Sequence, residues 1–219
     1  MFDELHVYHD AEPKSGALNM AVDEALLLTT SCPTLRLYHW LGRALSFGYF
    51  GRYAEVAGQQ RDHDIVRRWT GGGIVPHGDD LTYSIIIPSA APTCARSSLQ
   101  IYSDVHEAIR AALVANQIDA ALANSAAPKI SNACFANAVR HDVICAGEKI
   151  AGAAHRRSRA GLLHQGSIQL EKLPARFVHD FASRLCPGFE GRDLSPPLID
   201  RAHALAQSKY GTVEWLTRR

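Results

Sequence analysis

The chain has 219 residues, a hydrophobic fraction of 47% and a formal net charge of +1, which favours one globular domain, residues 1–219, and shows no basic excess of the kind that nucleic-acid-binding proteins carry. No stretch approaches the roughly 18 consecutive apolar residues that a membrane span needs, and the first residues, MFDELHVYHD, lack the pattern of a signal peptide, so we expect no membrane association and a cytoplasmic protein. The five cysteines include no CxxC pair, which argues against a disulfide framework and against a zinc site.

Strands and short helices alternate in the part of the chain before residue 67. Ser15 is expected to cap a helix over residues 17–28, because apolar residues recur there at helical spacing. Asn19 and Asp23 lie four residues apart on this helix, so they share a face that is either solvated or borders a binding site. The other elements expected here are strands at 5–9, 34–40, 44–49 and 64–68 and a short helix at 53–60.

The most informative stretch is RRWTGGGIVPHGDDLTYSIIIP, from Arg67 to Pro88. Three consecutive glycines let the backbone approach a bound group closely and leave successive N–H groups free to bind an anion or a carbonyl oxygen. Arg67 and Arg68 precede them and could neutralise such an anion. The spacing is neither that of a Walker loop nor that of GxGxxG. A glycine-rich turn beside a solvated basic pair is the alternative interpretation.

The second half of the chain predicts a helix followed by an antiparallel meander. A loop at 89–98 is long for a compact domain. The elements expected after it are a helix at 99–117, strands at 119–122, 141–146, 148–154 and 162–170, a helix at 173–185, a linker at 187–197 and a helix at 197–209. Residues 187–219 could form a C-terminal helical extension of the domain.

Three blocks in order resemble one known family. LNMAVDEALL (Leu18 to Leu27), RRWTGGGIVPHGDDLTYS and GEKIAGAAHRRSRAGLLHQGSIQL (Gly147 to Leu170) are similar to the first helix, the lipoyl-pocket motif and the lysine motif of the lipoate-protein ligase A and octanoyltransferase superfamily. That superfamily shares its fold with the biotin protein ligase catalytic domain. The resemblance therefore implies an α/β (α+β) domain with a mixed sheet and packed helices.

The resemblance also implies the site residues. Lys149 matches the lysine that contacts the acyl carbonyl, and in ligases the phosphate as well; an ammonium there would stabilise charge on the carbonyl oxygen. His77 and His164 match histidines beside the two motifs, where either could accept a proton from the incoming lysine or be a satisfied core residue. No metal ligands are expected. The residues expected to bind the acyl substrate are Arg67, Arg68, Gly71, Gly72, Gly73, His77, Trp40, Gly48, Tyr83, Gly152, Ala153 and His164.

Cys134 distinguishes the branches of the family. The segment Ala133-Cys134-Phe135, fifteen residues before Lys149, resembles the nucleophile loop of cysteine-dependent octanoyltransferases, although Cys134 could also be a buried, inert thiol. Those transferases usually have arginine at the position of Gly73, and three glycines are the ligase form. Classical ligases carry a further C-terminal domain or a partner subunit, and we expect no such domain within this chain.

The favoured function is therefore transfer of octanoate from acyl carrier protein, through a Cys134 thioester, to a lysine of a lipoyl domain. Glycine-cleavage H protein and the acyltransferase subunit of a 2-oxoacid dehydrogenase are the expected acceptors. One alternative is a lipoate-protein ligase that uses ATP and Mg²⁺ to form a lipoyl-adenylate, with or without a separate subunit. The other is a non-catalytic module that binds a lipoyl group or a nucleotide. No covalently bound cofactor is expected, and lipoate or octanoate is the substrate.

Overall fold

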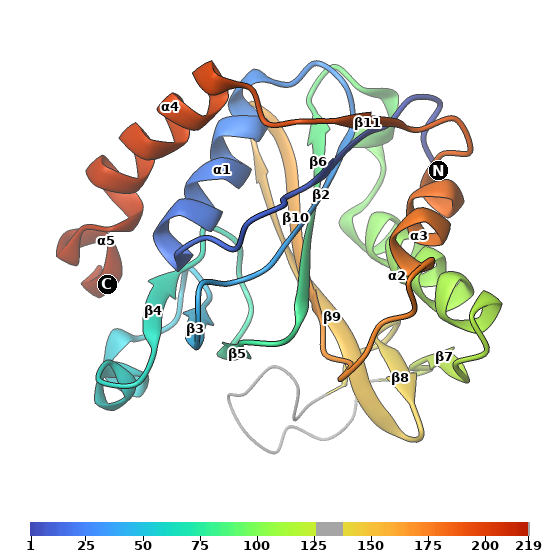
Figure 1. Ribbon diagram of the computed structural model, residues 1–219, viewed down its shortest axis with the longest axis horizontal. Coiled ribbons are helices and arrows are strands. Elements are labelled where there is room, and N and C mark those ends of the chain that lie inside the picture. The colour runs from blue at the N-terminus through green and yellow to red at the C-terminus, as the bar shows by residue number, and fades with distance from the viewer. Residues whose placement is uncertain (126–137, 219) are drawn as a thin grey trace.

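The larger of two sheets forms the centre of the molecule in the computed structural model, which describes residues 1–125 and 138–218 (Figure 1). Its strand order is β11-β1-β2-β6-β10-β9-β8-β7. β1 pairs in parallel with β2 and β11, and the other neighbours are antiparallel. The bounds are β1 His6–His9, β2 Thr34–Tyr38, β6 Leu81–Pro88, β7 Ala120–Leu122, β8 Val143–Cys145, β9 Glu148–Ser158, β10 Gly161–Ile168 and β11 Glu190–Arg192.

A second, three-stranded sheet has the order β4-β3-β5 and comprises β3 (Ala44–Phe47), β4 (Asp64–Arg67) and β5 (Val75–His77). β3 is parallel to β4 and antiparallel to β5. The prediction of a mixed α/β fold is confirmed. However, the strands expected at 44–49 and 64–68 form this separate sheet, and β5 was not predicted because its three residues, Val-Pro-His, carry too little β pattern.

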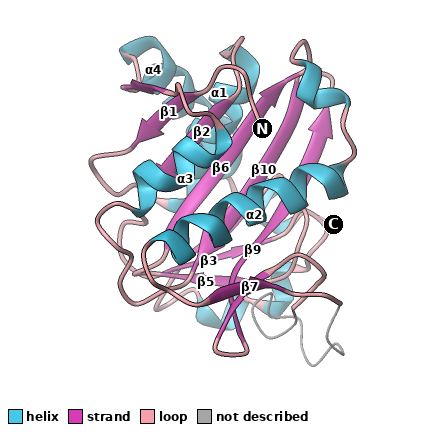
Figure 2. Cartoon of the chain, turned by 90° about the vertical axis from the view of Figure 1, so that its right-hand side faces the viewer, coloured by secondary structure: helices cyan, strands magenta, loops and turns pink. Residues whose placement is uncertain are grey.

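Helices cover both faces of the large sheet. In Figure 1, α1 and α4 lie on one side of the sheet, and α2 and α3 on the other, where Figure 2 shows them crossing its strands. Ser15 caps α1 as predicted, and Ser97 with Gln100 forms a capping box at α2. None of the helices in the described part of the chain is long and apolar enough to cross a membrane. The bounds are α1 Gly16–Thr29, α2 Ser98–Ala115, α3 Phe177–Leu185, α4 Pro196–Leu205 and α5 Val213–Thr217, with one π-helical turn at Ala206–Tyr210.

Three local predictions are wrong. The expected linker at 187–197 contains β11, which pairs with β1 at the edge of the large sheet. The helix expected at 53–60 is instead two short 3₁₀ turns, Tyr53–Glu55 and Ala57–Gln59. The helix expected from residue 173 begins only at Phe177. β11 and each of the two 3₁₀ turns are three residues long, and tertiary neighbours rather than local propensity decide elements this short.

A buried ionic network joins α1 to the large sheet. The Arg36 guanidinium, fully buried on β2, donates to Asp23 Oδ1 (2.7 Å), to Asn19 Oδ1 (2.9 Å) and to Asp10. Asn19 and Asp23 are therefore buried, which rules out the solvated face that was one of the two alternatives. Charged groups can be buried at this position because each meets a partner of opposite charge or a hydrogen-bond donor.

Candidate active site

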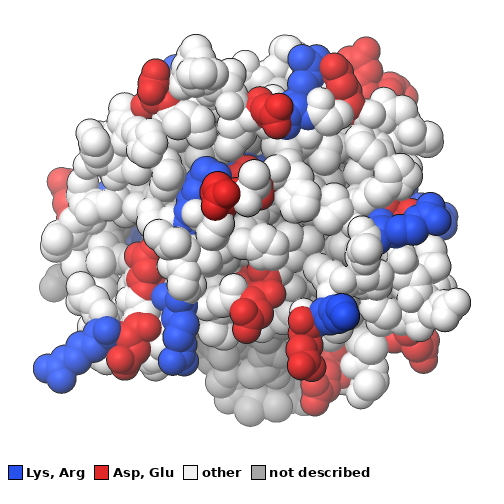
Figure 3. Space-filling model, in the orientation of Figure 1, with Lys and Arg blue, Asp and Glu red and all other residues white. Residues whose placement is uncertain are grey.

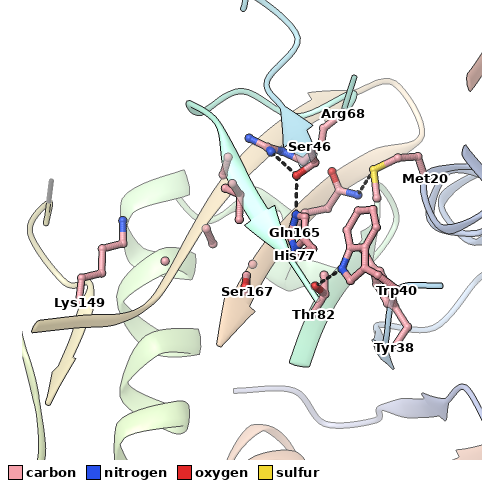
Figure 4. Close-up of a pocket in the computed structure, with 15 residues that line it drawn as sticks. Met20, Tyr38, Trp40, Ser46, Arg68, His77, Thr82, Lys149, Gln165 and Ser167 are labelled. Atoms are coloured by element: carbon pink, nitrogen blue, oxygen red, sulfur yellow. Dashed lines mark hydrogen bonds between the residues drawn. The ribbon is translucent and has the colours of Figure 1, made fainter. Parts of the chain in front are cut away.

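A pocket lies between the large sheet and the three-stranded sheet (Figure 4). One end has apolar walls from α1 and β2, and the other end is reached by the side chain of Lys149 from β9. Small residues on β9 and β10 line the wall between the two ends. The lining residues are Met20, Tyr38, Trp40, Ser46, Arg68, Val75, His77, Thr82, Lys149, Gly152, Ala153, Ala154, Gln165, Gly166 and Ser167.

The glycine turn closes over β3 beside the pocket. Gly72 has φ +89°, a left-handed conformation that favours glycine. A Cβ at Gly48 would collide with the Gly72 carbonyl oxygen, so Gly48 allows the turn to approach β3. Arg68 holds the turn by donating to the carbonyl oxygens of Gly71 (3.1 Å) and Gly73 (2.8 Å). The glycines therefore build a tight backbone turn beside the pocket.

A chain of polar side chains runs along the pocket wall. The Arg68 guanidinium donates to Ser46 Oγ (2.6 Å), Ser46 Oγ lies 2.6 Å from His77 Nε2, and His77 Nδ1 lies 2.8 Å from Asp80 Oδ2. Because Arg68 is always a donor, the Ser46 hydroxyl is left to donate to His77 Nε2, and His77 Nδ1–H donates to Asp80. The same Asp80 oxygen also accepts from Thr82 and Ser167.

Burial favours the neutral form of His77. Burial lowers the pKa of His77 and outweighs the opposing effect of Asp80. Burial opposes ionisation of Asp80, but the hydrogen bonds from His77 and Ser167 outweigh it, so the pKa of Asp80 is lowered. Both ring nitrogens of His77 already have partners, which suits a residue that shapes the pocket better than one that accepts a proton from substrate.

The apolar end of the pocket is fixed by its own contacts. The Trp40 ring stacks on the His77 ring with centroids 3.9 Å apart, and Trp40 Nε1 donates to Thr82 Oγ1 (2.7 Å). Gln165 donates to Met20 Sδ (3.4 Å). Burying an aliphatic chain against such walls contributes about 0.8 kcal/mol for each methylene group.

Lys149 marks the other end. Its ammonium lies 2.9 Å from Asp142 Oδ2, and its side chain is only 7% exposed. The Asp142 carboxylate is fully buried and also accepts from the Tyr102 hydroxyl and from the Val139 amide N–H. A Cβ at Gly152 would collide with the end of the Lys149 side chain, so the small residue makes room for the lysine. Asp142 thus directs a positive charge into the pocket.

The structure brings together Arg68, His77, Trp40, Lys149, Gly152 and Ala153, which all line the pocket, with Gly48 and Gly71 to Gly73 in the adjoining turn. Tyr83 and His164 belong instead to the opposite face of the sheet, which packs against α2. Cys134 lies outside the described residues.

Arg67 lies away from the pocket lining. Its guanidinium donates to the carbonyl oxygens of Tyr49 (2.8 Å) and Gly51 (2.7 Å) on one side and of Leu216 (2.9 Å) and Arg218 (2.8 Å) on the other. Burial lowers its pKa, and the positive charge of Arg218 adds to the effect. The contacts make Arg67 a clamp that fastens the C-terminal segment to the body.

Replacing Arg67 with methionine is expected to lower the free energy of unfolding by about 3 kcal/mol, because several carbonyl groups lose a charged donor together. Urea denaturation measures this change, and limited proteolysis should show earlier cleavage near the C-terminus. Arg52→Met is the matched control, since the Arg52 side chain is 82% exposed. Equal stability of the two variants would contradict the clamp.

Three histidines share the opposite core with Tyr83. His106 Nε2 and His164 Nε2 each lie 3.1 Å from the Tyr83 hydroxyl, and His155 packs against His164 with ring centroids 4.7 Å apart. His164 Nδ1 and both ring nitrogens of His155 are buried without a protein partner. Burial lowers the pKa of His106 and of His155 to about 4, and that of His164 well below its usual value.

These histidines predict loss of stability in mild acid. In the unfolded chain His106 and His155 take up protons near pH 6.5, and in the folded chain they do so only near pH 4. The stability that these two side chains provide above pH 6.5 is therefore lost as pH falls through that window, by up to about 3 kcal/mol for each of the two. Urea denaturation from pH 7.5 to 4.5 measures it. In His155→Gln, the free energy of unfolding should fall less steeply with decreasing pH, by the slope that corresponds to about one proton. An unchanged slope would contradict the assignment of this loss to the buried histidines.

Sequence reasoning missed several residues of the site: Met20, Asp80, Asp142, Gln165 and Ser167. Asp80 could have been predicted from the sequence, because it lies between a histidine and an apolar strand in HGDDLTYS. Asp142 precedes β8 and lies seven positions before Lys149, so only the β8–β9 hairpin brings their side chains together.

Sequence comparisons agree with the three motifs. The model of the lipoyl protein ligase A/B catalytic domain family matches residues 15–179. Octanoyltransferase LipM of Oceanobacillus iheyensis is 39% identical over 76% of this chain and 64% of its own length. Octanoyltransferase LipM of Kyrpidia tusciae is 36% identical over 73% and 64%. The chain thus matches just under two thirds of the length of each of these two relatives. Its match to octanoyltransferase LipM of Carboxydothermus hydrogenoformans covers 95% of that protein's length, at 29% identity.

Solved structures share the fold. A Thermoplasma acidophilum protein solved with bound lipoic acid superimposes with a TM-score of 0.76, over 99% of both chains, at 20% identity. A lipoate-protein ligase A bound with ATP gives a TM-score of 0.73, also over 99% of both chains and at 20% identity. At this level of identity the likeness establishes the common fold.

Proposed function

Since the chain belongs to the lipoyl protein ligase A/B catalytic domain family, we propose that it transfers an octanoyl group from acyl carrier protein to a lysine of a lipoyl domain. The observation that carries this is the pocket, which joins an apolar end at Met20 and Trp40 to the buried ammonium of Lys149. The relatives named octanoyltransferase support the choice of acyl group.

In this proposal the octanoyl chain lies against Met20 and Trp40, and its carbonyl oxygen points to Lys149. Each buried methylene contributes about 0.8 kcal/mol, so an eight-carbon chain binds tightly without any charged contact of its own. The Lys149 ammonium, oriented by Asp142, stabilises the negative charge that develops on the carbonyl oxygen as a nucleophile adds. Arg68, through Ser46 and His77, keeps the wall of the pocket in place.

The reaction would proceed in two acyl transfers through Cys134. The Cys134 thiolate attacks the carrier-protein thioester, a thioester forms on Cys134, and the carrier thiolate leaves and takes up a proton. The amine of the acceptor lysine then attacks that thioester, the Cys134 thiolate leaves, and the amine loses a proton as the amide forms. Splitting the transfer in this way replaces one difficult step by two easier ones. Glycine-cleavage H protein and the acyltransferase subunit of a 2-oxoacid dehydrogenase are the proposed acceptors, in the cytoplasm.

One observation favours a second candidate. Gly73 occupies the position where the cysteine-dependent branch usually has arginine, and its carbonyl oxygen accepts from Arg68 within the glycine turn. This turn would suit a lipoate-protein ligase, in which ATP, with Mg²⁺, activates a free acid as its adenylate.

Intact-protein mass spectrometry of the acceptor separates these functions. The chain is incubated with a lipoyl domain and either octanoyl-acyl carrier protein, or lipoate with ATP and Mg²⁺. An octanoylated acceptor in the first mixture is the expected result. A product in the second mixture alone identifies a ligase, and no product in either identifies a binding module.

A further inference from the structure

Three cations and three aromatic rings alternate in a closed ring near the C-terminus. Each cationic group lies over two of these aromatic rings, 4.3 to 4.9 Å from their centroids, and Lys209 also lies over the Tyr210 ring. The side chains come from the loop after β3, the glycine turn, β9 and the C-terminal segment. We call this cluster the cation–aromatic ring; its members, in order, are Arg218, Tyr49, Arg156, Trp69, Lys209 and Trp215.

The cation–aromatic ring has an excess of positive charge. Lys209 pairs with Glu24 at 2.6 Å. Within residues 1–125 and 138–218, no carboxylate lies within 4 Å of the guanidinium of Arg156 or Arg218, and Arg156 Nε is buried without a hydrogen-bond partner. The buried guanidinium of Arg67 donates to the Arg218 carbonyl and adds a further positive charge. Such crowding of like charges is relieved when an anionic surface binds.

The surroundings have the composition of a protein interface. Phe50 is 86% exposed, and its ring packs edge-on against Tyr49 with centroids 5.0 Å apart. Arginine, tryptophan and tyrosine are the residues that most often dominate binding energy at interfaces. On the face shown in Figure 3, basic and acidic side chains are interspersed. An apolar anchor beside a concentrated positive charge fits an acidic protein.

The position of the cation–aromatic ring indicates which acidic protein it fits. Arg156 follows the pocket residue Ala154 by two positions on β9, so both side chains lie on the same face of the strand. Arg156 also lies seven positions beyond Lys149, about 23 Å along an extended strand. The lysine side chain of an acceptor is too short to span that distance, whereas the prosthetic arm of a carrier protein is several times longer.

We propose that the cation–aromatic ring docks the acidic body of the carrier protein that brings the acyl thioester, while its arm reaches along β9 to Lys149. This inference rests on the proposed transfer reaction for its substrate. Docking here would contribute to the affinity for the donor and to its association rate, and it would leave the chemical step unchanged.

The test compares Arg156→Glu with Arg176→Glu, which makes the same change of charge on α3 at a side chain that is 79% exposed. Binding of octanoyl-acyl carrier protein is measured by titration calorimetry, and KM and kcat are measured with that donor and with octanoyl-pantetheine. At low salt, Arg156→Glu should weaken carrier binding and raise KM for the carrier protein at least tenfold. It should leave kcat with the carrier protein unchanged, as well as kcat and KM with octanoyl-pantetheine. The affinity for the carrier protein should also depend less on salt concentration than it does in wild type. Arg176→Glu should behave as wild type.

Phe50→Ser provides a second variant at an exposed position, so its effect does not depend on the packing of Arg156. Equal carrier affinity of wild type, Arg156→Glu and Phe50→Ser would overturn the proposal, as would a wild type that does not bind the carrier. A rise in KM for the lipoyl domain alone would assign the surface to the acceptor and overturn it too. Carrier binding that is lost in Arg156→Glu, with no transfer by wild type, would support the docking surface and contradict the transfer reaction.

Discussion

Replacing Lys149 with alanine is expected to slow octanoyl transfer by about a hundredfold to a thousandfold, the loss that follows removal of one preorganised group from a developing oxyanion. The Lys149 ammonium is the positive charge that Asp142 directs into the pocket from β9. The loss should fall on kcat rather than on KM, because the charge on the carbonyl oxygen develops only in the transition state. Steady-state kinetics with octanoyl-acyl carrier protein and a lipoyl domain measure both constants.

The same substitution is expected to cost stability, which a lysine at a strand edge would not. Lys149 is the ion-pair partner of the fully buried Asp142, and its removal leaves that carboxylate without its counter-charge, although the Tyr102 and Val139 donors remain. Removing one partner of a buried ion pair lowers the free energy of unfolding by about 3 kcal/mol or more. A loss of activity in Lys149→Ala could therefore be attributed to unfolding unless a control separates the two effects.

The double variant Lys149→Met with Asp142→Asn supplies that control. It removes both charges at once, keeps a hydrogen-bonding group at residue 142, and should recover most of the stability lost in Lys149→Met. Its activity should remain as low as that of Lys149→Ala. A double variant that regains both stability and activity would show that Lys149 acts only through the fold.

Replacing Cys134 with serine is expected to abolish the acyl-enzyme intermediate and to lower transfer by several orders of magnitude, as removal of a catalytic nucleophile does. The motivation is the Ala133-Cys134-Phe135 segment fifteen residues before Lys149, together with relatives named octanoyltransferase. A serine hydroxyl at this position has a much higher pKa than a thiol, so it cannot replace the thiolate at neutral pH.

Intact-protein mass spectrometry after exposure to octanoyl-acyl carrier protein measures the intermediate directly. Wild type should gain one octanoyl group that hydroxylamine removes, and Cys134→Ser should gain none. Cys145→Ser is the matched control, because Cys145 is a partly exposed thiol of the same chain. An unmodified wild type, with Cys134→Ser fully active on lipoate and ATP, would favour the ligase.

Local pattern predicted much of the fold. The helical spacing after Ser15, the β-branched run from Leu81 and the apolar repeat within α2 each specify an element without help from distant residues. The three motifs predicted the family, and the resemblance predicted that Arg68, His77, Trp40 and Lys149 belong to one site; all four line the pocket.

Only the tertiary structure decided which polar residues serve the pocket and which serve the fold. Arg67 and Arg68 are adjacent in sequence, but strand alternation sends their side chains to opposite faces, so one clamps the C-terminal segment and the other holds the glycine turn. The sequence left open whether Asn19 and Asp23 are solvated, and their hydrogen bonds with Arg36 of β2 show that they are buried in the fold.

The sequence also did not predict the ion-pair partner of Lys149. Asp142 meets it because the β8–β9 hairpin folds one strand back on the other, and Tyr102 joins them from α2, forty residues away in the chain. Periodicity and motif spacing predict the structure of the segment in which a residue lies. Contacts between Lys149, Asp142 and Tyr102 depend instead on how separate segments pack against one another. The sequence by itself thus determined the elements, the family and the lysine, whereas the packing of β8, β9 and α2 decided which carboxylate orients that lysine.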